Sequence, residues 1–294
     1  MVKKNIRFIV NPHSGSSKIK VDEATIKSHL NLDLYSYDLA YTEFAGHAKD
    51  LAKDAVDKGY DTVVAVGGDG SINEVASQLV HTAVNLAIIS AGSGNGFATN
   101  IGLARNNAEQ AIDVINNRKI EQIDTCSVND IFFINVGGVG FDGKVSYRVK
   151  NSNKRGLMMY IKTAILESSS YQFLDLEIRI DGKLITGQYV TIAIANAAMY
   201  GYNFVIAPAA DFQDGILDIV AIRKTSKIKY FLSSWRFLAK SLHNSKYVDV
   251  YRGKKIELKS KNPETFFHVD GEGFKTSEVL TFQVVPNSLN LILP

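Results

Sequence analysis

The chain has 294 residues, a formal net charge of +3 and an apolar content of 46%, which suit a globular protein of two domains. Cys126 is the single cysteine and excludes an intramolecular disulfide. The sequence lacks an apolar segment long enough to span a bilayer, and residues 1–10 lack the apolar stretch of a signal peptide. We therefore expect a cytoplasmic protein whose membrane contact is peripheral.

The first half of the chain alternates strands with helices. We expect strands at residues 5–10, 34–41, 62–66 and 85–89, and helices within 18–30, at 46–58, from 71 to 79 and within 107–117. This alternation predicts a parallel sheet with both faces covered. The predicted fold of residues 1–125 is a Rossmann-like three-layer α/β domain.

The most distinctive stretch is residues 67–71, Gly-Gly-Asp-Gly-Ser, which follows the buried strand at 62–66. Consecutive glycines allow close approach of the backbone to a ligand, and the first N–H groups of a helix attract anions. An acid in such a loop repels a phosphate unless a cation lies between them, so Asp69 indicates Mg²⁺. The alternative is a turn aspartate in a glycine-rich connection.

Three further strand ends carry unusual residues, namely Asn11 to Ser14, Thr42, and Gly92 to Asn95. In open α/β sheets, ligands bind beyond the carboxyl ends of the strands. Four such loops at one edge predict a nucleotide-phosphate site. The sequence contains neither the common P-loop motif nor the dinucleotide fingerprint Gly-x-Gly-x-x-Gly with its distant acid.

The second half changes to successive strands, expected at 132–136, 173–180, 184–195, 216–222, 255–258, 266–269 and 279–284. They predict an antiparallel sandwich or barrel-like domain, and we favour a β-sandwich over residues 126–285 with inserted helices. One helix is expected near 157–168, with an apolar stripe that includes Tyr160, Ile161 and Ile165. Another is expected near 227–243.

Charge is unevenly distributed along the chain. Residues 223–261 contain twelve Lys or Arg and two acidic residues, a local charge of +10, whereas the rest carries 21 basic and 28 acidic residues. The basic segment predicts an anionic partner surface. Its helix at 227–243 fits either packing on the sheet with a solvated basic face or contact with anionic lipid.

Two loops of the second half are rich in oxygen ligands. Residues 207–218 contain Asp211, Asp214 and Asp218, which suit a hard cation or a turn capped by aspartates. Residues 269–273 place Asp270 and Glu272 in a turn after a strand. An enzyme that phosphorylates a hydroxyl needs a base for the hydroxyl proton and acids for Mg²⁺, whereas a plain type I′ hairpin turn is the alternative.

In this order the motifs resemble the diacylglycerol kinase catalytic-domain family, which includes bacterial soluble lipid kinases and sphingosine kinases. The resemblance rests on residues 67–74 and also on residues 11–15, Thr42 with 46–48, 92–98, 135–142, 214–215 and 270–272. It implies an ATP-binding α/β domain and a β-rich lipid-substrate domain. It also implies that the final strand, within residues 286–294, returns to the first domain.

The resemblance further implies roles for individual residues. Asp69, Asp124 and Asp270 would surround a catalytic Mg²⁺, and Glu272 or Asp270 would accept the hydroxyl proton. A second, structural Mg²⁺ would bind the Asp214 carboxylate and the carbonyls of Asp211 and Ile216. The residues implied to contact ATP are Asn11, Ser14, Thr42, Gly67, Gly68, Gly70, Ser71, Asn73, Ser93 and Asn95.

We predict ATP-dependent phosphorylation of a lipid hydroxyl, with diacylglycerol as the leading substrate. Asn95-Gly96 departs from the Asn-Asp of many bacterial diacylglycerol kinases, so a sphingoid-base or other lipid kinase is an alternative. NAD kinases place a separate Asn-Glu after the glycine loop, whereas the only Asn-Glu here is Asn73-Glu74, so this reading ranks lower. A catalytically silent lipid-binding protein is the last alternative.

The expected partners are a lipid substrate and an anionic membrane, which would contact residues 223–261. We expect no nucleic-acid partner, and a homodimer is left open.

Overall fold

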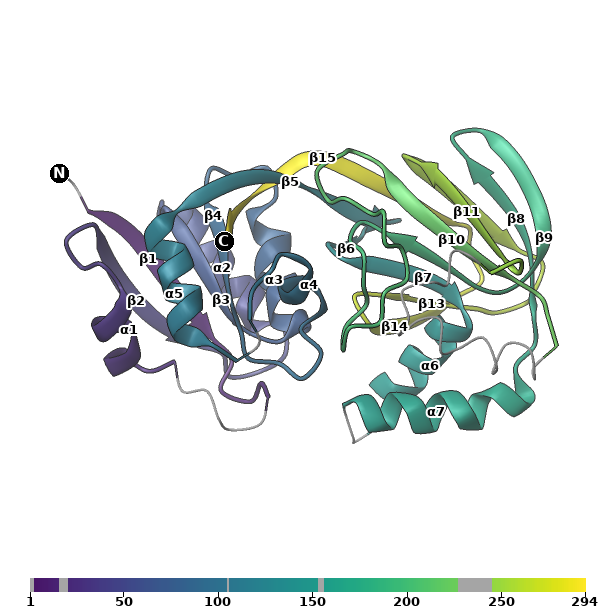
Figure 1. Cartoon of the computed structure of the whole chain (residues 1–294), viewed down its shortest axis with the longest axis horizontal. Coiled ribbons are helices and arrows are strands. Elements are labelled where there is room, and N and C mark those ends of the chain that lie inside the picture. Colours follow the sequence, from purple (N-terminus) through teal and green to yellow (C-terminus); the bar gives the residue numbers. More distant parts are fainter. Residues whose placement is uncertain (1–2, 16–20, 105, 153–155, 227–244) are drawn as a thin grey trace. The chain divides into compact units, whose positions relative to one another are not determined.

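The computed structural model describes residues 3–15, 21–104, 106–152, 156–226 and 245–294. The chain divides into two compact units, Met1–Ile123 with Asn287–Pro294, and Asp124–Pro286, which we describe one at a time (Figure 1). The helix expected at 227–243 lies outside the described residues.

The first unit contains a parallel sheet with strand order β2-β1-β3-β4-β15. Strands β3 and β4 are buried along their whole length, because a parallel sheet is covered on both faces, and their sequences are accordingly apolar. The strands are β1 (Lys4–Val10), β2 (Tyr35–Tyr41), β3 (Thr62–Gly67), β4 (Asn85–Ser90) and the end of β15 (Leu280–Leu293).

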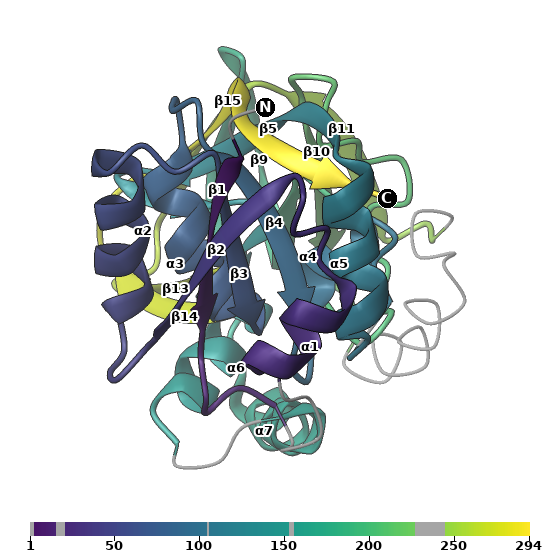
Figure 2. The ribbon, with the colours of Figure 1, turned by 90° about the vertical axis from the view of Figure 1, so that its left-hand side faces the viewer.

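Helices cover both faces of this sheet (Figure 2). On one face α2 contacts α3, and on the other α1 contacts α5. The helices are α1 (Glu23–His29), α2 (His47–Asp57), α3 (Asp69–Leu79), the short α4 (Gly96–Asn100) and α5 (Ala108–Asn117). The predicted three-layer α/β fold is confirmed, although α3 begins at Asp69 and not at Ser71.

The second unit is an antiparallel β-sandwich with the strand path β14-β13-β7-β9-β8-β12-β15, to which β10 and β11 add beside β9. Its strands are β5 (Lys119–Val128), β6 (Ile131–Phe133), β7 (Val136–Gly140), β8 (Leu174–Ile180), β9 (Lys183–Ala195), β10 (Leu217–Arg223), β11 (Val248–Gly253), β12 (Lys255–Ser260), β13 (Thr265–Val269) and β14 (Glu272–Thr276). The predicted sandwich is confirmed. Strands β5 and β15 each run from one unit into the other.

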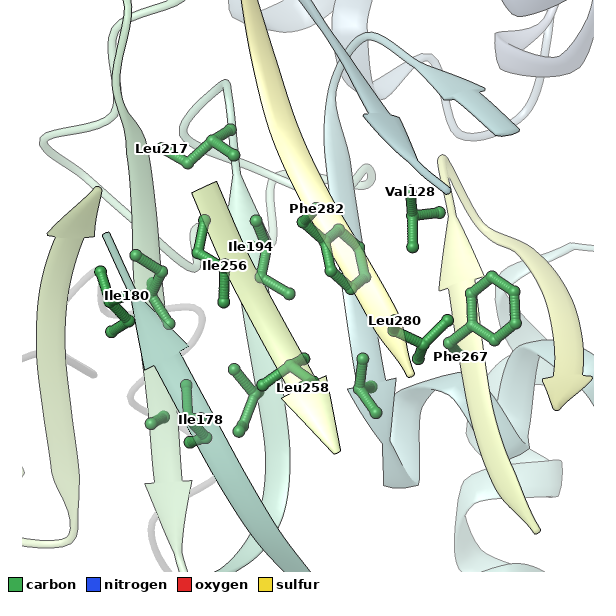
Figure 3. Close-up of a cluster of buried hydrophobic side chains, with 14 of the residues drawn as sticks. Val128, Ile178, Ile180, Ile194, Leu217, Ile256, Leu258, Phe267, Leu280 and Phe282 are labelled. Atoms are coloured by element: carbon green, nitrogen blue, oxygen red, sulfur yellow. The ribbon is translucent and has the colours of Figure 1, made fainter. Parts of the chain in front are cut away.

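Alternating residues of these strands form the core of the second unit. Ile178, Ile256 and Leu258 lie in one buried cluster with Leu280 and Phe282 (Figure 3). Successive side chains of a strand point to opposite faces, so residues two positions apart, such as Ile256 and Leu258, lie on the same face. The cluster fixes the register of the strands that carry the candidate acids.

The strand predicted at 132–136 is wrong, because β6 ends at Phe133 and β7 begins at Val136. Strand β7 reads Val-Gly-Gly-Val-Gly, and glycine is a poor strand former, so the strand is hidden in the sequence. The glycines make room for neighbours. A Cβ at Gly137 would lie 2.7 Å from the Phe282 ring, and one at Gly138 would lie 2.4 Å from the Asp142 carboxylate.

The helices described in the second unit are α6 (Phe141–Lys150) and α7 (Leu157–Ser170). Ile161 and Ile165 are among the apolar residues that the sequence predicts on this helix. Both are exposed, and Thr163 is the buried residue of the helix. Each helix in the described part of the chain falls short of the length and hydropathy that a membrane span requires.

Candidate active site

The four predicted loops follow the carboxyl ends of β1, β2, β3 and β4 and therefore lie at one edge of the parallel sheet. Asn11 continues β1 by donating its N–H to Val66 at 3.0 Å, and Thr42 donates its N–H to Val10 at 2.9 Å. The Asn11 side chain then donates to the Ser71 hydroxyl at 3.0 Å. The structure thus brings Asn11 and Ser71 together at the start of α3.

Glycines allow two loops of this edge to touch. A Cβ at Gly92 would lie 2.5 Å from Gly68 Cα, and a Cβ at Gly67 would lie 2.6 Å from the Ser71 side chain. Real side chains do not tolerate such distances, so this backbone packing requires glycine at 67 and 92. The backbone of the two glycine loops therefore packs closely around the N-terminus of α3 and forms a wall there. The first-turn N–H groups at this end have no acceptor within the helix.

Asp69 is the first residue of α3 and is half-buried. One of its carboxylate oxygens accepts a hydrogen bond from the Phe97 N–H at 3.3 Å, which ties the first glycine loop to α4. Gly70 and Ser93 are exposed, whereas Asn73 is half-buried on α3. A carboxylate at a helix N-terminus is an oxygen ligand placed where phosphate oxygens also bind.

Asn95 is fully buried in the second glycine loop and adopts a left-handed conformation, with φ of 51°. Its amide donates to the Gly92 carbonyl at 2.8 Å, and its backbone carbonyl accepts from Thr99. Asn tolerates this backbone region better than most residues. Asn95 therefore shapes the loop that packs on Gly68, and Ser14, whose hydroxyl bonds to the Asn11 carbonyl at 2.9 Å, shapes the loop after β1.

In the second unit Asp270 occupies the turn between β13 and β14. Asp270 and Gly271 have φ of 48° and 85°, as in a type I′ turn. The Asp270 carboxylate accepts three backbone N–H groups, from Ile134 at 3.0 Å, Asn135 at 3.0 Å and Val136 at 3.1 Å. The turn is thus more than a plain hairpin, because its acid fastens the β6–β7 connection.

Asp124 is fully buried and fastens the loop that was predicted to bind a structural metal. Its carboxylate accepts the Gly215 N–H at 2.6 Å, and its N–H bonds to the Phe212 carbonyl at 2.7 Å. Burial raises the pKa of the nearby Cys126 thiol, and the charges of Asp270 and Asp124 raise it further. Both acids therefore lie close enough to Cys126 to act on the same thiol.

The Asp214 carboxylate already has partners within the protein. It accepts the Ile216 N–H at 3.0 Å and forms an ion pair with Arg252, which also lies 3.5 Å from the buried Asp218 carboxylate. Asp211 accepts the Gln213 N–H at 3.0 Å. In this structure the Arg252 guanidinium supplies the positive charge beside the Asp214 carboxylate, and the structural Mg²⁺ at this loop stays a prediction. Within the described ranges, no three His, Cys, Asp or Glu side chains are grouped to hold a metal ion.

Glu272, the candidate proton acceptor, is exposed at the start of β14. Its carboxylate lies 2.7 Å from the Lys150 ammonium at the end of α6. The same ammonium lies 4.2 Å from the centre of the Phe274 ring, so two contacts hold the lysine beside the acid. Asp69 belongs to the first unit, whereas Asp124, Asp270 and Glu272 belong to the second.

A buried network that sequence reasoning missed surrounds Asp142, the second residue of α6. Its carboxylate accepts the Tyr200 hydroxyl at 2.9 Å and a hydrogen bond from Thr191, and it lies 3.3 Å from His268 Nε2. The signal was present in residues 135–142, where a glycine-rich strand leads into a helix. The network anchors α6 to β9 and β13, and β13 leads directly into the Asp270 turn.

This network gives a pH prediction. Burial alone raises the pKa of Asp142, but the charge of His268 and the hydrogen bonds from His268, Thr191 and Tyr200 outweigh it and lower the pKa below its ordinary value. Ionised Asp142 therefore stabilises the fold above the unfolded-state pKa, and this contribution is lost as pH falls through the folded-state pKa.

We expect the thermal stability of Asp142→Asn to fall less steeply than that of wild type between about pH 5 and about pH 2. Unfolding curves of wild type, Asp142→Asn and the exposed Asp57→Asn check this, and identical acid slopes in all three would contradict it.

Comparison with known proteins agrees with this two-unit structure. Residues 5–128 match the family described as "Diacylglycerol kinase catalytic domain", and residues 135–293 match "YegS C-terminal NAD kinase beta sandwich-like domain". The chain is 27% identical to "Diacylglycerol kinase" of Bacillus subtilis (strain 168) over 92% of this chain and 90% of the relative. It is 28% identical to "Probable lipid kinase YegS-like" of Pseudomonas putida (strain KT2440) over 87% and 85% of the two chains.

A crystal structure of a diacylglycerol kinase from Bacillus anthracis str. Sterne shares the fold, with a TM-score of 0.74 and 19% identity over 99% of this chain and 97% of that one. The two matching domains occur in the same order as the α/β unit and the β-sandwich unit. The chain belongs to the diacylglycerol kinase catalytic-domain family.

Proposed function

We propose that the protein transfers the γ-phosphate of ATP to a lipid hydroxyl, with diacylglycerol as the substrate and phosphatidic acid as the product. The observation that carries this proposal is the glycine-walled N-terminus of α3, which places the Asp69 carboxylate beside backbone donors. Such a loop suits phosphate oxygens and the cation that accompanies them. The family relatives named as lipid kinases support the hydroxyl of a lipid as the acceptor.

The residues of this chain divide the chemistry between them. The first-turn N–H groups of α3 would orient the phosphates, and Asn11 and Ser71 hold the wall of the loop. Asp69 would hold Mg²⁺, which when bound neutralises charge on the transferring phosphoryl group. Glu272 or Asp270 would take the hydroxyl proton. Glu272 is the better acceptor on local geometry, because the Asp270 carboxylate is already committed to three N–H groups.

A lipid panel tests this proposal. Purified protein, radiolabelled ATP and Mg²⁺ are mixed with vesicles that contain diacylglycerol, monoacylglycerol or sphingosine, and with NAD as a soluble acceptor. We expect label in phosphatidic acid only. Label in sphingosine phosphate would assign the same chemistry to another lipid, and label in NADP would replace the proposal with an NAD kinase. ATP that stays unconsumed with every acceptor would indicate a silent lipid-binding protein.

We also propose that the basic segment at 223–261 meets an anionic membrane, and this predicts salt-sensitive binding. Its described part contains Lys254 and Lys259, both exposed. Salt screens exposed charges, so co-sedimentation with anionic vesicles should fall as salt rises. Lys254→Glu with Lys259→Glu should weaken binding, whereas Lys49→Glu with Lys53→Glu on α2, an equal change of net charge, should not. Binding that is indifferent to salt, or equally weakened by both pairs, would contradict this assignment.

A further inference from the structure

Helix α7 presents its apolar side chains outward. Met158, Ile161, Ile165 and Leu166 are 76%, 41%, 63% and 64% exposed, and all four lie on one face at spacings of three, four, seven and eight residues. A helix that packs on a protein core shows the opposite pattern, with its apolar stripe buried. Solvated apolar side chains gathered on one helix face mark an interaction surface.

The opposite side of α7 makes the polar contacts that attach the helix to the protein. Glu167 binds Lys144 at 2.8 Å and Arg148 at 3.1 Å, which fixes α7 to α6. The Tyr160 hydroxyl donates to the Gly271 carbonyl at 2.9 Å, within the turn that carries Asp270. These polar contacts hold α7 against the protein beside half-buried Leu157 and Ala164, and the four exposed apolar side chains face away from it.

Basic residues outnumber acidic ones in the sequence around α7. Lys144 and Arg148 pair with Glu167 of α7, and Lys150 pairs with Glu272. Residues 143–162 contain six Lys or Arg and no acidic residue, and Lys162 is exposed on the apolar face itself. An apolar helix face bordered by basic side chains is complementary to the surface of an anionic bilayer, where acyl chains receive the apolar groups and headgroups receive the cations.

A second copy of the chain fits this face poorly. A helix of 14 residues is about 21 Å long, so one face covers on the order of 200 Å², well below the roughly 800 Å² that each partner of a stable complex buries. A symmetric contact would also place the same basic residues opposite one another.

We propose that the outer face of α7 inserts into the interfacial region of an anionic bilayer. This inference rests on the proposed function, because it supplies the surface from which a lipid substrate would be taken. Through the hydrogen bond of Tyr160 to Gly271, the docked helix is continuous with the turn of the candidate acids. In the sequence, α7 (Leu157–Ser170) is separate from the basic segment at 223–261.

A polarity-sensitive fluorophore on the helix tests the proposal. Ile165→Cys provides the attachment site, since the native Cys126 is buried and burial raises its pKa, which keeps it unreactive. Leu184→Cys on β9 is the matched control, because Leu184 is 47% exposed but lies outside α7. Emission is recorded with and without vesicles of phosphatidylcholine and phosphatidylglycerol. In parallel, Ile161→Ser with Ile165→Ser is compared with Leu184→Ser for vesicle binding.

The probe at position 165 should shift to shorter wavelength when vesicles are added, and the probe at 184 should not shift. The double serine variant should bind vesicles about tenfold more weakly. An unshifted probe at 165 on vesicle-bound protein would overturn the proposal. Absence of binding to the vesicles would also overturn it. A probe already shifted without vesicles would show that the chain or a second copy covers the face. None of these readouts needs phosphate transfer. A protein that shows the fluorescence shift but has no kinase activity would therefore contradict the proposed function and still support membrane insertion of α7.

Discussion

Asp69→Asn is expected to lower the rate of ATP-dependent lipid phosphorylation by about 10³-fold, because it removes a charge at the place where phosphate charge is balanced. The amide oxygen can still accept the Phe97 N–H that Asp69 accepts at 3.3 Å. The loop should therefore keep its shape, and the loss should fall on the chemical step and on Mg²⁺ dependence. Initial rates at several Mg²⁺ concentrations measure both effects.

The matched control for this variant is Asp50→Asn. Asp50 is also an acid in the first turn of a helix of the same unit, α2, and is exposed, so its loss removes the same charge without touching the glycine loops. Its rate should stay close to that of wild type. If the rate of Asp69→Asn lies within a few-fold of the Asp50→Asn rate, the assignment of Asp69 to catalysis is wrong.

Asp270→Ala is expected to destabilise the second unit by about 3 kcal/mol, because it leaves three buried N–H groups without an acceptor, at roughly 1 kcal/mol each. Ile134, Asn135 and Val136, which donate those groups, are at most 4% exposed. Glu272→Gln removes only an exposed ion pair with Lys150 and should leave stability nearly unchanged. It should instead lower phosphate transfer by about 10²-fold or more if Glu272 accepts the proton.

Urea unfolding and initial rates on both variants separate the two roles. Asp270→Ala should shift the urea midpoint strongly, and Glu272→Gln should shift the rate alone. A stable, inactive Asp270→Ala together with an active Glu272→Gln would transfer the role of base to Asp270. Two stable and active variants would show that neither acid takes the proton.

The sequence allowed prediction of those parts in which local pattern and tertiary burial agree. Strand β3 is a β-branched run that stops at glycines, and α3 carries a regular apolar stripe, so both were predicted to within two residues. The close approach of Gly68 and Gly92 follows from the same pattern, because loops at one edge of a parallel sheet meet.

The missed features depend on partners distant in sequence. Strand β7 is glycine-rich because Phe282 and Asp142 need its space, and those partners are not visible in a local window. The ion pair of Asp214 with Arg252 joins residues 38 positions apart, and helical spacing alone cannot tell which side of α7 faces outward. The assignments of Asp69, Asp124, Asp270 and Glu272 stay predictions until the variants are measured.

The position of strand β15 has a consequence for folding during translation. Residues 287–294 complete the parallel sheet beside β4, yet they leave the ribosome only after the whole β-sandwich has been synthesised. Until then the nascent first unit exposes the edge of β4, a row of unpaired backbone groups of the kind on which other strands dock. The α/β unit, although its first strands are made first, can therefore complete its sheet only after the β-sandwich has been synthesised.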